Sequence, residues 1–200
     1  MSGDRLITLR FPVALVLSIV CLAAPPARAD FKAGENAYHR GDYATALREW
    51  QPLAKQGDAV AQYHLGLLYA NGQGIPKDDA QARQWYEKAA VQDHVEAQVN
   101  LGMLFDYGRG GPQDFKMAVR WYLRAANQGN ELAQRKLGLL YERGDGVQQD
   151  FVQAYMWYKL GAASGVKAGI VLRDALAIRM TSDQLLEAQK LAREWRPKGK

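Results

Sequence analysis

Cysteine is almost absent from this sequence: among its 200 residues the only cysteine is Cys21. It lies within residues 1–29, which have the features of a secretion leader, so the chain left after cleavage would have no cysteine. Such a chain cannot form disulfides, even in an exported compartment that permits them. It also cannot build a cysteine zinc site or use a thiol nucleophile.

The leader is predicted from three features at the N-terminus. Arg5 and Arg10 make a basic start, residues 11–22 form a mainly apolar run, and Ala27-Arg28-Ala29 has the small-x-small form of a signal peptidase site. The run is shorter than the roughly 20 residues that span a bilayer, which favours a cleaved leader over an uncleaved membrane anchor. We expect cleavage after Ala29, export to the periplasm or to the outside of the cell, and no integral membrane segment afterwards.

A strong net charge and catalytic motifs are also lacking. The formal net charge of +5 is too small to indicate nucleic acid, so no nucleic-acid partner is expected. His39, His64 and His94 have no spacing typical of a metal site, and we interpret them as surface residues. No nucleophile elbow, phosphate loop or zinc-protease motif is present. Asp78 and Asp79 are adjacent carboxylates, but Asp78 is better placed to cap a helix than to do acid–base chemistry. We expect no catalytic residue, metal or cofactor.

What the sequence does contain is a repeat with a period of 36 residues, and so many matching columns at one period are not a chance result. The recurring columns are Ala61, Ala97 and Ala133; Leu65, Leu101 and Leu137; Gly66, Gly102 and Gly138; Tyr69, Phe105 and Tyr141; Asp78, Asp114 and Asp150; Ala82, Ala118 and Ala154; and Trp85-Tyr86, Trp121-Tyr122 and Trp157-Tyr158.

Each repeat is predicted to form two helices, since helix formers dominate and β-branched runs are scarce. Ala61 and Leu65 lie on one apolar face of a first helix. Gly66 lies inside that helix, which suggests that a neighbouring helix comes close. Asp78 is well placed as the N-cap of the second helix, and Gln81 three residues later resembles the partner of a capping box. The tryptophans of the repeat are predicted to belong to the core.

The repeated pattern Ala-x-x-x-Leu-Gly-x-x-Tyr, followed by Asp-x-x-x-Ala-x-x-Trp-Tyr, resembles the Sel1-like repeat family, a relative of the tetratricopeptide repeat. The resemblance implies an all-α fold: a right-handed α-solenoid of antiparallel helix pairs with a C-terminal capping helix. The predicted segments are the signal peptide at 1–29, a degenerate tetratricopeptide-like repeat at 30–57, Sel1-like repeats at 58–93, 94–129 and 130–165, and C-terminal capping helices with a tail at 166–200. Thr181 and Gln184 predict a capping box in the last segment.

In solenoids of this kind the first helices line a concave groove, and the resemblance implies which columns face a ligand. Leu67, Met103 and Leu139 would form an apolar line with charged residues beside it; the alternative is a solvated face without a binding role. The predicted groove residues are Val60, Tyr63, Leu67, Ala70 and Asn71 in the first repeat, Glu96, Val99, Met103, Asp106 and Tyr107 in the second, and Leu132, Arg135, Leu139, Glu142 and Arg143 in the third.

The resulting hypothesis is an exported, non-enzymatic scaffold that binds a partner peptide or protein domain in this groove, as a monomer. The resemblance suggests envelope regulation, assembly of an envelope complex or host contact as its context. The mildly basic C-terminal segment is a second possible binding surface. A different hypothesis is an exported hydrolase acting on cell wall or β-lactam, because a cysteine-rich exported branch of the family is linked to that chemistry. The paired cysteines of that branch are missing here.

Overall fold

The computed structural model describes residues 30–197, so the predicted signal peptide at 1–29 lies outside the described residues. Within this range the chain forms ten helices and no strand. They are α1 (Phe31–His39), α2 (Tyr43–Lys55), α3 (Ala59–Asn71), α4 (Asp79–Ala90), α5 (Val95–Tyr107), α6 (Phe115–Asn127), α7 (Glu131–Arg143), α8 (Phe151–Leu160), α9 (Lys167–Ala177) and α10 (Ser182–Glu194). No helix in this range is long and apolar enough to cross a membrane.

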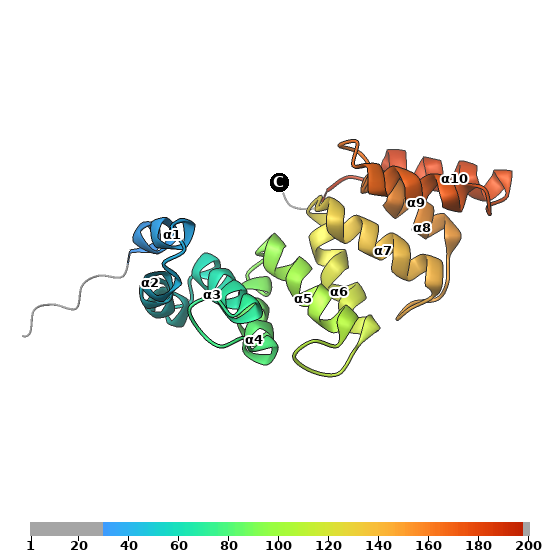
Figure 1. Cartoon of the computed structure of the whole chain (residues 1–200). Helices are drawn as coiled ribbons and strands as arrows, with labels where there is room; N and C mark the ends of the chain where they lie inside the picture. The colour runs from blue at the N-terminus through green and yellow to red at the C-terminus, as the bar shows by residue number, and fades with distance from the viewer. Residues whose placement is uncertain (1–29, 198–200) are drawn as a thin grey trace, which may run out of the picture.

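The helices form an extended stack that follows the order of the chain (Figure 1). The main contacts join each helix from α1 to α9 to the helices before and after it, and α10 packs on α8. The predicted α-solenoid is therefore confirmed. The arrangement leaves the first helices of successive repeats, α3, α5 and α7, as neighbours with a shared face.

Aspartates start the second helices, as the sequence predicts. Asp78, Asp114 and Asp150 are the N-caps of α4, α6 and α8, and each side chain accepts a hydrogen bond from a backbone N–H in the first turn. The capping box expected from Gln81 is not formed, because its side chain returns no bond to the cap in the described structure. The box predicted at Thr181 is complete and starts α10.

The glycine inside each first helix allows a tyrosine of the second helix to lie against its backbone. A Cβ placed on Gly102 would lie 2.7 Å from ring carbons of Tyr122. The same construction gives 2.4 Å between Gly66 and Tyr86. Such distances are far below van der Waals contact, so a side chain at these positions would push the two helices apart. The close approach expected from the glycine column is confirmed.

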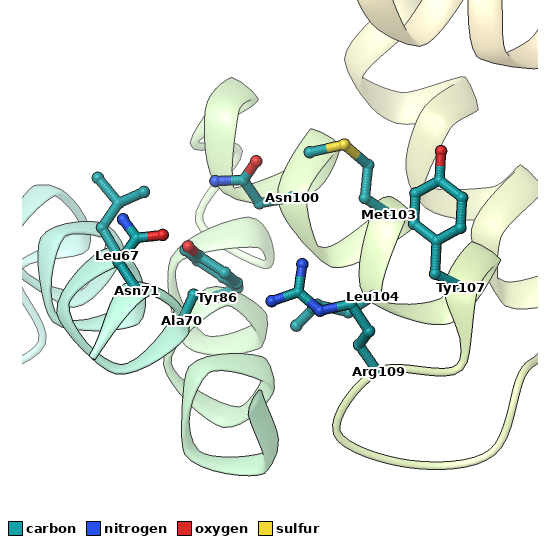
Figure 2. Close-up of a pocket in the computed structure, with 9 residues that line it drawn as sticks. All are labelled: Leu67, Ala70, Asn71, Tyr86, Asn100, Met103, Leu104, Tyr107 and Arg109. Atoms are coloured by element: carbon teal, nitrogen blue, oxygen red, sulfur yellow. The ribbon is translucent and has the colours of Figure 1, made fainter. Parts of the chain in front are cut away.

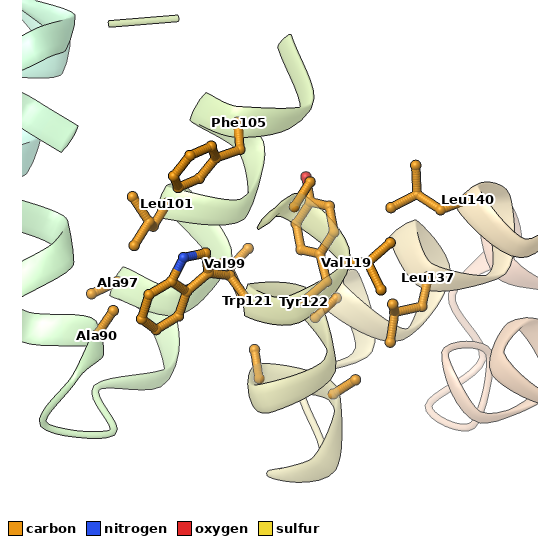
Figure 3. Close-up of a cluster of buried hydrophobic side chains, with 14 of the residues drawn as sticks. Ala90, Ala97, Val99, Leu101, Phe105, Val119, Trp121, Tyr122, Leu137 and Leu140 are labelled. Carbon is orange, nitrogen blue, oxygen red and sulfur yellow. The ribbon is translucent and has the colours of Figure 1, made fainter. Parts of the chain in front are cut away.

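The hydrophobic core runs along the stack instead of forming a single centre. Figure 3 shows its middle part, where Trp121 and Tyr122 of α6 lie among apolar side chains of α5 and α7. Trp121 and Trp157 are buried, as predicted, whereas Trp85 in the same column is partly exposed. Trp50 is fully buried, and its Nε1 donates to the carbonyl oxygen of Phe31 at 3.2 Å.

Buried glutamines, which the sequence analysis does not anticipate, tie each first helix to the end of the preceding second helix. Each Nε2 donates to a backbone carbonyl eight residues earlier, near a helix C-terminus that would otherwise leave that oxygen unpaired. The bonds run from Gln62 to Ala54 at 3.0 Å, from Gln98 to Ala90 at 3.1 Å and from Gln134 to Ala126 at 3.2 Å. We call these three side chains the glutamine ladder.

Candidate functional site

A pocket of about 200 Å³ opens on the face formed by α3 and α5 (Figure 2). It also reaches α4 and the turn that follows α5. Its lining residues are Leu67, Ala70 and Asn71 of α3, Tyr86 of α4, Asn100, Met103, Leu104 and Tyr107 of α5, and Arg109 of the turn. Five of the predicted groove residues therefore meet here: Leu67, Ala70, Asn71, Met103 and Tyr107.

The pocket combines apolar walls with polar groups. Leu67 lies on one side and Met103 on the other, with the polar ends of Tyr86, Asn100 and Arg109 in the space between them (Figure 2). Burial raises the pKa of the Tyr86 hydroxyl, so this group keeps its proton and acts as a hydrogen-bond donor. The arrangement can hold a ligand that offers both an apolar surface and a hydrogen-bond acceptor.

Arg109 is held at the edge of the pocket by Asp79. The guanidinium donates from Nε to Oδ2 at 3.0 Å and from Nη2 to Oδ1 at 2.6 Å. These hydrogen bonds lower the pKa of the Asp79 carboxyl and raise the pKa of Arg109. The remaining nitrogen, Nη1, makes no hydrogen bond within residues 30–197. Arg109 therefore keeps a fixed orientation and one N–H₂ group that is free to bind.

Two charged residues assigned to the groove are instead committed to internal contacts. Asp106 is 8% exposed, and its Oδ2 accepts from the Tyr122 hydroxyl at 3.2 Å and pairs with Lys136 Nζ at 3.3 Å. Glu142 accepts from the Tyr158 hydroxyl at 2.8 Å and forms an ion pair with Arg179. Asp106 is therefore buried and is not the open charged residue of the groove that was expected, and the partly exposed Glu142 is likewise held by a tyrosine and a cation within the stack.

Val99 is also not a groove residue, since only 4% of it is exposed. The reason is that Val99 belongs to the buried cluster that α5 shares with its neighbouring helices. Tyr63, one repeat earlier, stacks on His94 at 4.6 Å between ring centroids. Arg135, one repeat later, donates from Nη1 to the carbonyl oxygen of Gly161 at 3.1 Å. Tyr63 therefore contacts the following repeat, whereas Arg135 contacts the end of the second helix of its own repeat, and neither residue lines the pocket.

The other predicted groove residues lie away from this pocket. Val60, Glu96, Leu132 and Arg143 are exposed, and Leu139 is half-buried. None of them lines the pocket. The structure thus gathers predicted residues from the first and second repeats, but not from the third.

Four pocket residues were missed by the sequence analysis: Tyr86, Asn100, Leu104 and Arg109. A signal for one of them, Asn100, exists in the repeat alignment. Asn100 occupies the column of Lys136, and Ala70 occupies the column of Asp106, so the first pair of repeats differs from the second in its charged groups.

The interpretation of all three histidines as surface residues is only partly correct. His39 is exposed, but His64 is half-buried and stacks on Trp50 with 4.3 Å between ring centroids. His94 is the N-cap of α5, and its Nδ1 accepts from the backbone N–H of Ala97. Burial lowers the pKa of His64 and of His94. Within residues 30–197 no group of three His, Cys, Asp or Glu side chains is arranged to hold a metal ion.

Comparison with known protein families identifies the repeat units. The Sel1 repeat model matches residues 59–94, 95–130 and 132–166. A Sel1 repeat protein from Oxalobacter formigenes is 34% identical, with a TM-score of 0.67 over 70% of this chain and 58% of that chain. A protective antigen with an SLR fold, present in uropathogenic Escherichia coli strains, is 28% identical, with a TM-score of 0.50 over 82% of this chain and 44% of that one. This chain therefore spans less than two thirds of either structure. No curated protein matches it.

Proposed function

Since the chain belongs to the Sel1 repeat family, whose members generally mediate protein–protein interactions, we propose that it is a scaffold that binds a partner protein or peptide at the pocket between α3 and α5. The observation that supports this is the composition of the pocket. Leu67 and Met103 give it apolar walls, and the polar ends of Tyr86, Asn100 and Arg109 lie between them. Binding sites commonly combine an apolar lining with a few placed polar groups that fix the orientation of the ligand.

The proposal includes no enzymatic activity, because folds of this kind typically act as non-catalytic scaffolds. The chemistry of the pocket is consistent with that. Its lining has no histidine, carboxylate, serine or cysteine that could act as a nucleophile or as a general base. The hydrolase hypothesis thus gains no support from the pocket in the described part of the chain.

Binding at this pocket is tested by placing a charge on one of its apolar walls. Met103→Glu should reduce capture of the partner at least about tenfold, because a central apolar anchor contributes about 2 kcal/mol or more to binding. The partner is first identified by pull-down from envelope extract and mass spectrometry. Its affinity for wild type and variant is then measured by titration, with circular dichroism as the check on folding.

Leu186→Glu is the matched control, since Leu186 is an exposed leucine on α10, outside the pocket. It should leave capture unchanged. If Met103→Glu prevents folding, Tyr107→Glu takes its place, because 58% of Tyr107 is exposed. A folded pocket variant that captures the partner as well as wild type would refute the proposal. It would move the binding surface to the C-terminal helices, where Val171, Ile178 and Leu186 are exposed.

We also propose that the protein is exported, to the periplasm or the outside of the cell, and serves envelope regulation, assembly or host contact. The support is the basic start, the apolar run and the Ala27-Arg28-Ala29 site in the sequence. The Escherichia coli protein with the SLR fold, described as a protective antigen, gives weight to the host-contact context. Protein made in an exporting host should begin at Asp30 when its intact mass is measured. A chain that keeps residues 1–29 in a membrane fraction would refute cleavage.

A further inference from the structure

The joints between successive repeats can be compared with one another, because they use equivalent residues 36 positions apart. Where the second Sel1 repeat meets the third, the Tyr122 hydroxyl of α6 donates to Asp106 of α5 in the same repeat at 3.2 Å. At the next joint, the Tyr158 hydroxyl donates to Glu142 at 2.8 Å. In both cases the carboxylate lies 16 residues before the tyrosine. At the joint between the first and second repeats the tyrosine is Tyr86, and the position 16 residues earlier is an alanine, Ala70.

A cation accompanies each of the two internal carboxylates. Lys136 Nζ lies 3.3 Å from Asp106 Oδ2, and Arg179 pairs with Glu142. At the first joint the column of Lys136 holds Asn100, and the cation Arg109 lies at the edge of the pocket. The first joint therefore keeps hydrogen-bond donors on Tyr86, Asn100 and Arg109, but it lacks the carboxylate that the other two joints provide.

The missing carboxylate coincides with the pocket. Ala70, Tyr86, Asn100 and Arg109 all line it, and Figure 2 shows the polar side chains of the last three in the space between Leu67 and Met103. At the other two joints the equivalent position beside the tyrosine is filled by the protein's own carboxylate, Asp106 or Glu142. At the first joint the small side chain of Ala70 leaves it open to the groove.

We propose that this pocket binds an acidic side chain, Asp or Glu, of a partner peptide, and that the carboxylate takes the place held by Asp106 and Glu142 at the other joints. The inference rests on the proposed function and specifies the chemistry of the partner. The Tyr86 hydroxyl, the Asn100 amide and Arg109 Nη1 are its donors.

Three features of the pocket match this occupant. No carboxylate lines the pocket, so an incoming acid meets no like charge among the lining residues. Leu67 and Met103 provide an apolar surface for the methylene stem of the acid and for its neighbours in the peptide. Both internal carboxylates belong to side chains, Asp106 and Glu142, rather than to a chain end, which is why the proposal names a side chain.

The test uses three probe peptides: acetyl-Leu-Glu-Leu-amide, its glutamine counterpart, and the glutamine peptide with a free C-terminal carboxylate. Each is titrated into the isotope-labelled protein up to about 10 mM, the range suited to weak binding, and the shifts of α3, α5 and the Asn100 side-chain amide are followed by NMR. The glutamate peptide should bind saturably, and the glutamine peptide at least about tenfold more weakly, a difference of about 1.4 kcal/mol. Equal binding of these two, or no saturable shift with the glutamate peptide, would overturn the proposal. Preference for the free C-terminal carboxylate would overturn the choice of a side chain.

The matched variant fills the pocket from within. Ala70→Asp places a carboxylate at the position of Asp106, so it should leave folding intact and weaken binding of the glutamate peptide at least tenfold. Ala44→Asp adds the same charge at an exposed position of α2 and should not affect binding. Unchanged binding in folded Ala70→Asp would contradict the proposal. If Ala70→Asp does not fold, Tyr86→Phe removes a donor hydroxyl and should show the same loss.

The two levels of the hypothesis fail in different ways. If partner capture is lost in Met103→Glu but kept in Ala70→Asp, the acidic ligand is refuted and the pocket is still supported as the binding surface. Capture that is kept in both variants would remove the proposed function itself.

Discussion

Trp121→Ala should lower the free energy of unfolding by about 3–5 kcal/mol, the cost of deleting a large aromatic side chain from a core. Trp121 is 7% exposed and belongs to the cluster that α5, α6 and α7 share (Figure 3). In a stack whose helices contact mainly their neighbours, the cavity would weaken the joints on both sides of α6. Urea unfolding followed by circular dichroism measures the change, with the slope of the transition as the check on two-state behaviour.

Two control variants separate packing from other effects. The Nε1 of Trp121 is buried and has no hydrogen-bond partner in the described structure. Trp121→Phe removes this unpaired donor and keeps an aromatic ring, so its loss of stability should be clearly smaller than that of the alanine variant. Arg120→Ala, at an exposed neighbouring position, should cost under about 0.5 kcal/mol. Equal losses in Trp121→Ala and Arg120→Ala would show that Trp121 does not support the core.

Asp106→Ala is expected to cost about 2–4 kcal/mol, because it removes one partner of a largely buried ion pair. The side chains of Asp106 and Lys136 are 11% and 17% exposed, which places the cost somewhat below that of a fully buried pair. The ammonium of Lys136 would lose its counter-charge, and the Tyr122 hydroxyl would lose its acceptor. The free energy of unfolding in urea again provides the measurement.

The double variant Asp106→Ala/Lys136→Met provides the decisive comparison. It removes both charges, so it should recover a large part of the stability lost in Asp106→Ala. If the single variant is as stable as wild type, the pair makes no net contribution to the fold. If the loss of stability in the double variant equals the sum of the losses in Asp106→Ala and Lys136→Met measured separately, the two residues act independently.

The sequence predicts most of the packing residues, because they face inward in most repeats; Trp85, which is partly exposed, is an exception. Leu65 and Trp121 recur with the period of 36 residues, and both are buried in the structure. Gly102 recurs for the same reason, since any side chain there would meet the ring of Tyr122. Aspartate N-caps such as Asp114 were identifiable because a helix start needs a particular side-chain acceptor at one position.

The surface between repeats was harder to predict, because its burial depends on the neighbouring repeats and not on the helix that carries the residue. On an isolated α5 helix Val99 would be open to solvent, but in the assembled stack it is covered. Gln98 is polar and would be expected on the surface, yet it is fully buried as part of the glutamine ladder. His64 stacks on Trp50 of an earlier helix, a contact that the pattern of α3 does not contain.

The pocket residues were predictable only in part. Leu67 and Met103 were predicted to share an open face, and the structure brings them to the same pocket. Their role in binding is still a prediction. Tyr86 was assigned to packing, and it is buried, but its column does not reveal that its hydroxyl reaches the pocket. That feature depends on the small side chain of Ala70 in the place of a carboxylate, which is visible only when the joints are compared.

The order of contacts in the stack also has a consequence for how the chain acquires its structure. Its main contacts join helices that follow one another, apart from α10 on α8. Short sequence separations close small loops, which favours rapid folding, and in a stack of repeats the first paired helices can serve as a template for the next. A chain that emerges gradually, from a ribosome or a translocation channel, can therefore fold from its N-terminal end before its last helices are available.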